Sequence, residues 1–151
     1  MKRLQMTSAD LGELARLVRK VEFFAPMTVG QLEMVLPYIL LCEYPAGEKV
    51  FKQGAGGDAF YIVQKGKLSV LVSKGWFTSS EVAKLGPGDF FGEMALLSDA
   101  RRSATVACLE YSRLFVLMSA DFKFVLRKNP QFAAEVQRIA DRRKFLDQHE
   151  K

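Results

Sequence analysis

Histidine, cysteine and tryptophan are scarce in this chain of 151 residues, which has one His, two Cys and one Trp. Metal-dependent enzymes with a His and carboxylate site need several imidazoles, and Ser-His-Asp or Cys-His catalysis needs a His beside the nucleophile. The lone histidine, His149, lies almost at the C-terminal end of the chain. We therefore expect neither a metal or other cofactor nor a catalytic site, and predict that the chain is not an enzyme.

The two cysteines, Cys42 and Cys108, are far apart in the sequence and belong to no metal-binding or redox motif. Such thiols are typical of the core of a protein in a reducing compartment. We expect a cytoplasmic protein, or the cytoplasmic part of a membrane protein.

Long apolar runs are also lacking. The stretch from Val35 to Cys42 contains Pro37 and falls far short of the roughly 20 residues that a membrane-spanning helix needs. The N-terminal residues do not resemble a signal peptide. The sequence predicts no membrane span in this chain.

The length and composition indicate one domain with a substantial core, because 49% of the residues are hydrophobic. The net charge of +5 suits an anionic ligand. The basic residues are scattered, however, so we do not expect direct nucleic acid binding.

The N-terminal part, residues 1–38, predicts a pair of helices. Apolar residues recur every three or four positions between residues 7 and 22, with Thr7 or Ser8 available as a cap. Thr28 begins a second, shorter helix that ends near Pro37.

The middle part, residues 39–118, predicts short strands separated by glycine and proline. The expected strands are Leu40–Tyr44, Lys49–Lys52, Ala59–Lys65, Lys67–Ser73, Ser79–Leu85, Phe90–Phe91, Ser103–Ala107 and Ser112–Met118. Gly66 falls at an expected tight turn. Eight such strands predict an α+β fold around an antiparallel jelly roll or β-barrel.

The C-terminal part, residues 119–151, predicts two helices. Ser119 is the expected cap of the first, and Asn129-Pro130 ends it and opens the second. Helical spacing places Phe132, Val136, Ile139, Arg143 and Leu146 on one stripe of the second helix.

The segment from Phe90 to Val106 is the one whose residue types folding alone does not explain. A predicted short helix over Gly92–Leu97 follows the turn at Gly86–Asp89, and the start of a helix offers N–H donors to an anion. The chain then turns and brings Arg101 and Arg102 back toward those donors. On spacing alone, two interpretations are equally open. The segment is either an anion site, or an ordinary solvated arginine pair with Glu93 as an acid at the start of a helix.

The sequence of this segment resembles the phosphate-binding cassette of cyclic nucleotide-binding domains. It is similar to the cassette of bacterial cyclic nucleotide-gated potassium channels. The family carries Phe-Gly-Glu, an apolar residue and Ala-Leu, here Phe91 to Leu96. It then carries Arg, a small residue, Ala and Thr, here Arg102 to Thr105. The resemblance implies one cyclic nucleotide-binding domain over about residues 21–146, with a short cassette helix and a lid helix at the C-terminal end.

The resemblance also implies roles for individual residues. Backbone N–H groups around Gly92 and Ala95 would hold the phosphate oxygens, Arg102 would pair with the phosphate charge, and Glu93 would accept from the ribose hydroxyl. A planar guanidinium suits a singly charged cyclic phosphate. The full set of expected binding residues is Phe91, Gly92, Glu93, Met94, Ala95, Arg102, Ser103, Ala104, Ile139 and Arg143.

Arg143 has two interpretations. It is either a side chain whose stem covers apolar surface, or, with Ile139, a contact to the purine when the lid helix closes. In bacterial channels of the family an Arg at the corresponding helix position touches the base.

Two positions depart from the common pattern. Where many relatives have Pro, this chain has Arg101, either a second cation for the phosphate or a competitor for it. Ser103 stands where Ala tends to accompany cAMP and Thr tends to accompany cGMP, and we favour cAMP.

The sequence thus predicts a sensor that binds a cyclic mononucleotide and signals to an effector, such as a channel or kinase, by movement of its last helix. The alternative is a degenerate domain that keeps the fold for protein contact and binds no nucleotide. A DNA-binding output would require a winged helix-turn-helix after the long helix.

Overall fold

The structure is a computed structural model that describes residues 1–98 and 100–149, apart from the side chains of residues 143–149. Its elements are β1 (Lys2–Leu4), α1 (Ser8–Val18), α2 (Val29–Val35), η1 (Leu36–Tyr38), β2 (Leu40–Tyr44), β3 (Lys49–Phe51), β4 (Ala59–Lys65), β5 (Leu68–Ser73), β6 (Ser79–Leu85), β7 (Phe90–Phe91), α3 (Met94–Leu97), β8 (Thr105–Cys108), β9 (Ser112–Met118), α4 (Ser119–Lys128) and α5 (Pro130–His149).

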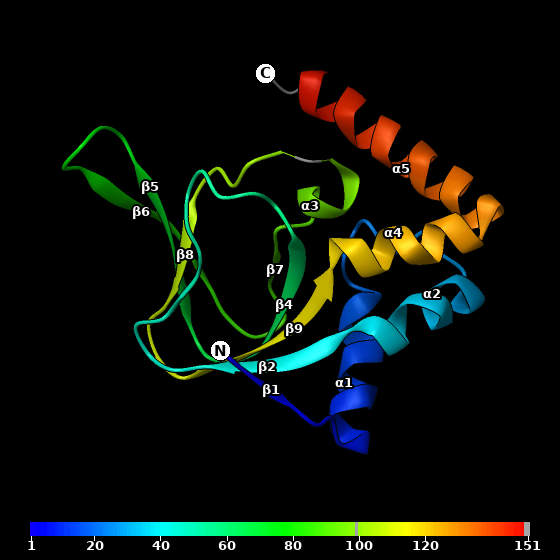
Figure 1. The fold of residues 1–151 in the computed structure, drawn as a ribbon, viewed down its shortest axis with the longest axis horizontal. Helices are drawn as coiled ribbons and strands as arrows, with labels where there is room; N and C mark the ends of the chain where they lie inside the picture. Colours follow the sequence, from blue (N-terminus) through cyan, green and yellow to red (C-terminus); the bar gives the residue numbers. More distant parts are fainter. Residues whose placement is uncertain (99, 150–151) are drawn as a thin grey trace.

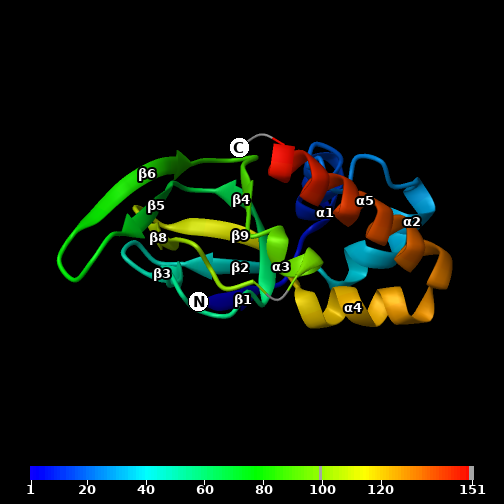
Figure 2. The ribbon, with the colours of Figure 1, turned by 90° about the horizontal axis from the view of Figure 1, so that it is seen from above.

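The strands form two antiparallel sheets, and the helices gather on one side of them (Figures 1 and 2). One sheet has the order β1-β2-β9-β4-β7, and the other has the order β3-β8-β5-β6. Figure 2 shows α1, α2, α4 and α5 beside one end of the strands, whereas the β5–β6 hairpin projects in the opposite direction. The predicted α+β fold with an antiparallel β-barrel is confirmed.

Strands β4 and β9 form a wall between two hydrophobic cores. Phe60 and Ile62 of β4 belong to the core that packs under the helices, while Tyr61 and Val63 belong to the core between the sheets. Strand β9 alternates in the same way, because successive side chains of a strand point to opposite faces. The same two strands therefore hold both cores.

The helical core is rich in phenylalanine. Phe122 of α4 makes edge contacts with Phe23, Phe24 and Phe132, at ring centroid distances of 5.9, 6.4 and 6.3 Å. Phe23 and Phe24 lie in the turns between α1 and α2, and Phe132 lies on α5, so these rings join the N-terminal and C-terminal parts of the chain.

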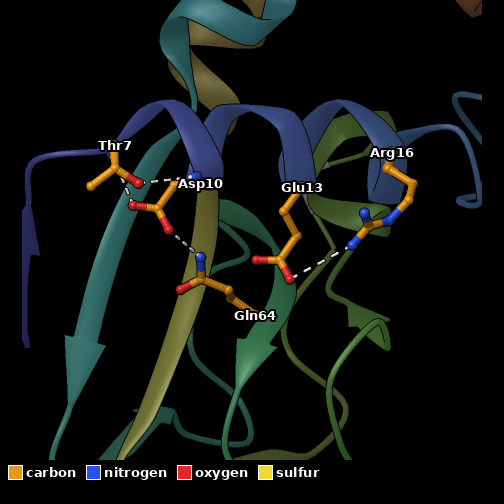
Figure 3. A network of polar contacts seen from close by, with 5 residues as sticks. All are labelled: Thr7, Asp10, Glu13, Arg16 and Gln64. Carbon is orange, nitrogen blue, oxygen red and sulfur yellow. Dashed lines mark hydrogen bonds and ion pairs between the residues drawn. The ribbon is translucent and has the colours of Figure 1, made fainter.

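Helix α1 is fixed at its start by a capping box that also reaches the sheet (Figure 3). The Asp10 amide donates to Thr7 Oγ1 at 3.1 Å, and the Thr7 amide donates to Asp10 Oδ2 at 2.9 Å. Gln64 Nε2 of β4 donates to the other Asp10 oxygen at 2.7 Å. Of the two predicted candidates for the α1 cap, Thr7 and Ser8, the helix uses Thr7. Thr28 caps α2 in the same manner, as predicted.

Several predicted details were wrong. The cap of α4 is Met118 rather than Ser119, and it makes no side-chain capping bond. The cassette helix begins at Met94, because Gly92 has φ +79°, a left-handed conformation that an α-helix does not contain. A ninth strand, β1, pairs with β2 and was not predicted.

Gly66 lies at the predicted tight turn between β4 and β5. Its φ is +109°, and a Cβ atom there would lie 2.2 Å from Ser112 Oγ. Both the conformation and the close approach of β9 require glycine at this position.

No helix in residues 1–98 and 100–149 is long and apolar enough to cross a membrane. Among the side chains that the structure describes, no group of three or more His, Cys, Asp or Glu is arranged to hold a metal ion.

Candidate functional site

A cavity of about 410 Å³ lies between the sheets and the segment that connects β7 to β8. Its wall combines residues of that segment with apolar side chains of the strands. The lining residues are Phe51, Val70, Phe90, Phe91, Gly92, Glu93, Met94, Ala95, Ala100, Arg101, Arg102, Ser103, Ala104 and Val106.

Gly92 allows the chain to enter α3 directly beside Arg102. A Cβ atom on Gly92 would lie 2.7 Å from Arg102 Nη1 and 3.0 Å from the Ala59 carbonyl oxygen. After this turn the Ala95 amide donates to the Gly92 carbonyl at 3.1 Å, and the Leu96 amide donates to the Glu93 carbonyl at 3.0 Å. Half-buried Glu93 occupies the N-cap position of α3.

A glycine-rich loop, residues 54–57, holds the arginine pair in place. The Arg102 amide donates to the Ala55 carbonyl, and the Gly54 amide donates to the Arg102 carbonyl, both at 2.8 Å. Arg101 Nη1 donates to the Gly54 carbonyl at 3.0 Å. A Cβ atom on Gly57 would lie 2.9 Å from the Ala100 carbonyl oxygen, so the loop packs too closely for a larger residue at this one position.

Arg102 is a buried cation at the cavity wall, with only 8% of its surface exposed. Its Nη2 atom donates to the Ala59 carbonyl at 2.6 Å. An Asp58 carboxylate oxygen lies 3.6 Å from Nη2, and that side chain is 71% exposed. Among the described residues, no hydrogen-bond partner reaches Arg102 Nε.

Aromatic rings lie next to the Arg102 guanidinium. The Arg102 guanidinium carbon lies 4.1 Å from the centroid of the Phe51 ring, a cation–π arrangement. The Tyr61 ring stacks on Phe91 at a centroid distance of 4.9 Å. Burial, and then the nearby Asp58 carboxylate, raise the pKa of Tyr61 to about 12, so its hydroxyl is neutral at physiological pH.

Every predicted site residue between Phe91 and Ala104 lines this cavity. Ile139 does not; it is half-buried and packs against the helical core. The side chain of Arg143 lies outside the described residues, so its two interpretations stay open. The individual binding roles of all these residues remain predictions.

The sequence did not point to the strand residues of the wall. Phe51, Val70 and Val106 come from three strands of one sheet and meet the cassette only in the folded chain. Phe90, Ala100 and Arg101 lie within the cassette, and of these three the sequence indicates only Arg101 as a site residue. Its position next to Arg102 was the one available signal.

The comparison with protein families agrees with this geometry. The family of cyclic nucleotide-binding domains matches residues 41–129, which include both sheets apart from β1, the cavity wall and α4. The match therefore extends well beyond the short cassette.

Two relatives of known class show the same relationship. The chain is 34% identical over 118 residues to a cyclic nucleotide-gated potassium channel of Mesorhizobium japonicum, covering 78% of this chain and 31% of the channel. It is 33% identical over 120 residues to the cyclic AMP receptor protein of Thermus thermophilus, covering 80% of this chain and 56% of the receptor. The chain thus corresponds to only part of each relative.

Among solved structures, the regulatory domain of Toxoplasma gondii PKA, solved with cAMP, superposes with a TM-score of 0.73 at 28% identity. The superposition covers 80% of this chain and 46% of that domain. Cavity, cassette, family match and structural likeness agree: the chain belongs to the cyclic nucleotide-binding domain family.

Proposed function

We propose that this chain is a non-enzymatic sensor that binds a cyclic mononucleotide, cAMP in preference to cGMP, in the cavity at Arg102. The cyclic phosphate lies against the Arg102 guanidinium, and the purine extends toward Ser103. Binding is reported through α5 to an effector protein or domain. Arg102 supplies the single observation that carries the proposal.

A buried cation is costly unless an anion compensates it. In the part of the chain that the structure describes, Arg102 has a distant carboxylate contact to the solvent-exposed Asp58 side chain, which compensates poorly. A cyclic phosphate carries a single negative charge and accepts hydrogen bonds from a guanidinium. It would supply the anion and a partner for the buried Nε atom.

Glu93 suits the ribose rather than the phosphate. It lies on the same wall as Arg102, and a carboxylate repels phosphate but accepts from a hydroxyl. Ser103 has a hydroxyl and no further methyl group, so it fits either base. Our preference for cAMP rests on the tendency in the family for Ala at this position to accompany cAMP, because Ser, like Ala, lacks the methyl group of Thr.

The last helix is the expected signalling element. A ligand shifts a conformational equilibrium only by binding one state more tightly than the other. Ile139, which packs on the helical core, and Arg143 are proposed to contact the purine only when α5 moves over the cavity. Their contacts would then transmit binding, whereas Arg102 and Glu93 would supply affinity.

The whole-protein context is also a proposal, because the relatives are longer than this chain. A channel, a kinase or another regulator is a suitable effector. The buried free thiols of Cys42 and Cys108 favour a cytoplasmic location, either alone or as the cytoplasmic part of a membrane protein.

Calorimetric titration with cAMP and cGMP in parallel tests the ligand assignment. We expect Arg102→Ala to lose roughly 1.5 to 3 kcal/mol of binding free energy, about ten- to a hundredfold in affinity, through loss of a charge-assisted hydrogen bond. The matched control is Arg101→Ala, which removes a neighbouring cation that bonds to the Gly54 carbonyl. It should change affinity less than Arg102→Ala does.

An unchanged dissociation constant for Arg102→Ala, in protein that unfolds cooperatively, would contradict the assignment. No heat with either nucleotide, in folded wild-type protein free of carried-over ligand, would favour a domain used for protein contact alone.

A further inference from the structure

The tip of the β5–β6 hairpin exposes two large aromatic side chains that the fold does not use. Trp76 is 95% exposed and Phe77 is 100% exposed. In Figures 1 and 2 the hairpin projects away from the barrel and from the helices. Trp76 and Phe77 do not line the nucleotide cavity, so the function proposed above does not explain them.

The turn itself does not depend on these rings. The Lys74 amide donates to the Thr78 carbonyl at 3.0 Å, and Ser73 Oγ donates to the carbonyl oxygens of Gly75 and Thr78. Gly75, with φ +97°, supplies the left-handed residue. Because polar contacts and glycine already close the turn, the exposed apolar surface needs another explanation.

The charge around the tip has one sign. Gln53 exchanges hydrogen bonds with the Ser73 backbone, which places the loop after β3, with exposed Lys52, against the hairpin. Residues 71–80 of the hairpin and 52–57 of this loop contain two Lys, Lys74 and Lys52, and neither Asp nor Glu; exposed Asp58 follows the loop directly. The next acid, Glu81, receives a hydrogen bond from Ser69 and lies near Lys84.

We propose that this hairpin tip docks on an anionic lipid bilayer, with Trp76 and Phe77 inserted at the headgroup level and Lys74 and Lys52 facing the lipid phosphates. Tryptophan favours the membrane interface because its ring is apolar and its N–H remains near water. Lysines beside the inserted rings are attracted by the negative surface potential. Insertion at the tip leaves both sheets and the cavity intact.

Trp76 is the only tryptophan of the chain, so its fluorescence reports on the tip alone. Vesicles of phosphatidylcholine mixed with phosphatidylglycerol should blue-shift the Trp76 emission and carry the chain into the pellet on sedimentation. Salt should weaken this binding because surface charges are screened. Pure phosphatidylcholine vesicles should bind less.

Variants separate the tip from general stickiness. The double variant Trp76→Ala/Phe77→Ala should reduce the vesicle partition coefficient at least about tenfold, because two large apolar side chains no longer leave water. Lys74→Glu should also reduce it. Leu109→Ala, which removes another exposed apolar side chain outside the hairpin, should bind vesicles as the wild type does.

The altered residues contact no core, so all variants should unfold at the wild-type temperature. Absence of a blue shift and of sedimentation with anionic vesicles would overturn the proposal, as would undiminished sedimentation of the double variant. Equal partition into neutral vesicles would overturn the anionic-surface assignment. A failed nucleotide titration would not affect this proposal, since the tip lies outside the cavity.

Discussion

Gly92 is the residue at which backbone conformation and ligand geometry meet. It has φ +79°, and its α-carbon faces the Arg102 guanidinium so closely that a side chain would displace it. The left-handed turn also sets where α3 begins. Gly92 therefore determines both the position of the Arg102 guanidinium and the position of the backbone amides at the start of α3.

We predict that Gly92→Ala lowers nucleotide affinity by about tenfold or more, because a misplaced guanidinium loses a charge-assisted hydrogen bond. The positive φ should also cost about 1 to 2 kcal/mol of unfolding free energy. Calorimetry and urea unfolding measure the two effects. The matched control is Gly88→Ala, since Gly88 has φ +89° but its nearest atom, Leu17 Cδ2, is 3.9 Å away.

Both variants should lose stability through the positive φ, Gly92→Ala somewhat more because its Cβ atom also crowds the Ala59 carbonyl, and only Gly92→Ala should lose affinity. Equal affinities in the two variants would show that Gly92 does not position Arg102.

At the scale of elements, α1 is attached to β4 through one carboxylate. The hydrogen bond from the Thr7 backbone amide is the main cause that lowers the pKa of Asp10, while burial opposes the shift and the Gln64 side chain reinforces it. A carboxyl group whose pKa is lower in the folded than in the unfolded state stabilises the fold at pH values above its unfolded-state pKa. That contribution disappears as the pH falls through the folded-state pKa.

We predict that Asp10→Ala loses about 1 kcal/mol of unfolding free energy at neutral pH, as a helix cap typically contributes. The difference from wild type should shrink as the pH falls below the ordinary Asp value of 3.8. Urea unfolding across this pH range measures it. A difference that stays constant with pH would mean that the ionised carboxylate is not what holds α1.

Element boundaries show what the sequence could and could not predict. The strands β2, β4, β6, β7 and β9 have the predicted ends. Glycine turns mark β4, β6 and β7, and β9 is marked by its run of apolar residues. Strand β1 lacks such signals: only its pairing with β2 makes Lys2–Leu4 a strand. Helix α1 stops at Val18, well before the predicted residue 22, and successive tight turns follow.

The candidate site divides in the same way. Its polar part is contiguous in sequence, so the spacing of Glu93 and Arg102 was visible before the fold was known. Its apolar wall of Phe51, Val70 and Val106 is assembled by strand pairing across the second sheet. No local pattern distinguishes these from other core residues.

On the scale of the whole molecule, the two cores are not independent, because β4 and β9 contribute to both. Loss of packing in the helical core should therefore also destabilise the barrel. Phe122 is the central residue for this test, since its ring contacts both Phe23, between α1 and α2, and Phe132 of α5.

We predict that Phe122→Ala costs about 3 to 5 kcal/mol of unfolding free energy, the range for removing a buried phenylalanine. Helical circular dichroism and the near-ultraviolet signal of the barrel tyrosines should report one coincident transition. Phe124→Ala, on the same helix but partly exposed, should cost much less. Two separated transitions would contradict the shared wall.

The shared wall also governs which changes of chain length the fold can accept during evolution. One residue inserted in β4 or β9 would exchange the side chains that face the helices with those that face the barrel. Phe60 and Ile62 would then enter the space of Tyr61 and Val63, and both cores would lose their fit at once. The side chains at the β5–β6 tip pack against neither core. We therefore expect length variation among descendants of this sequence in that hairpin rather than in β4 or β9.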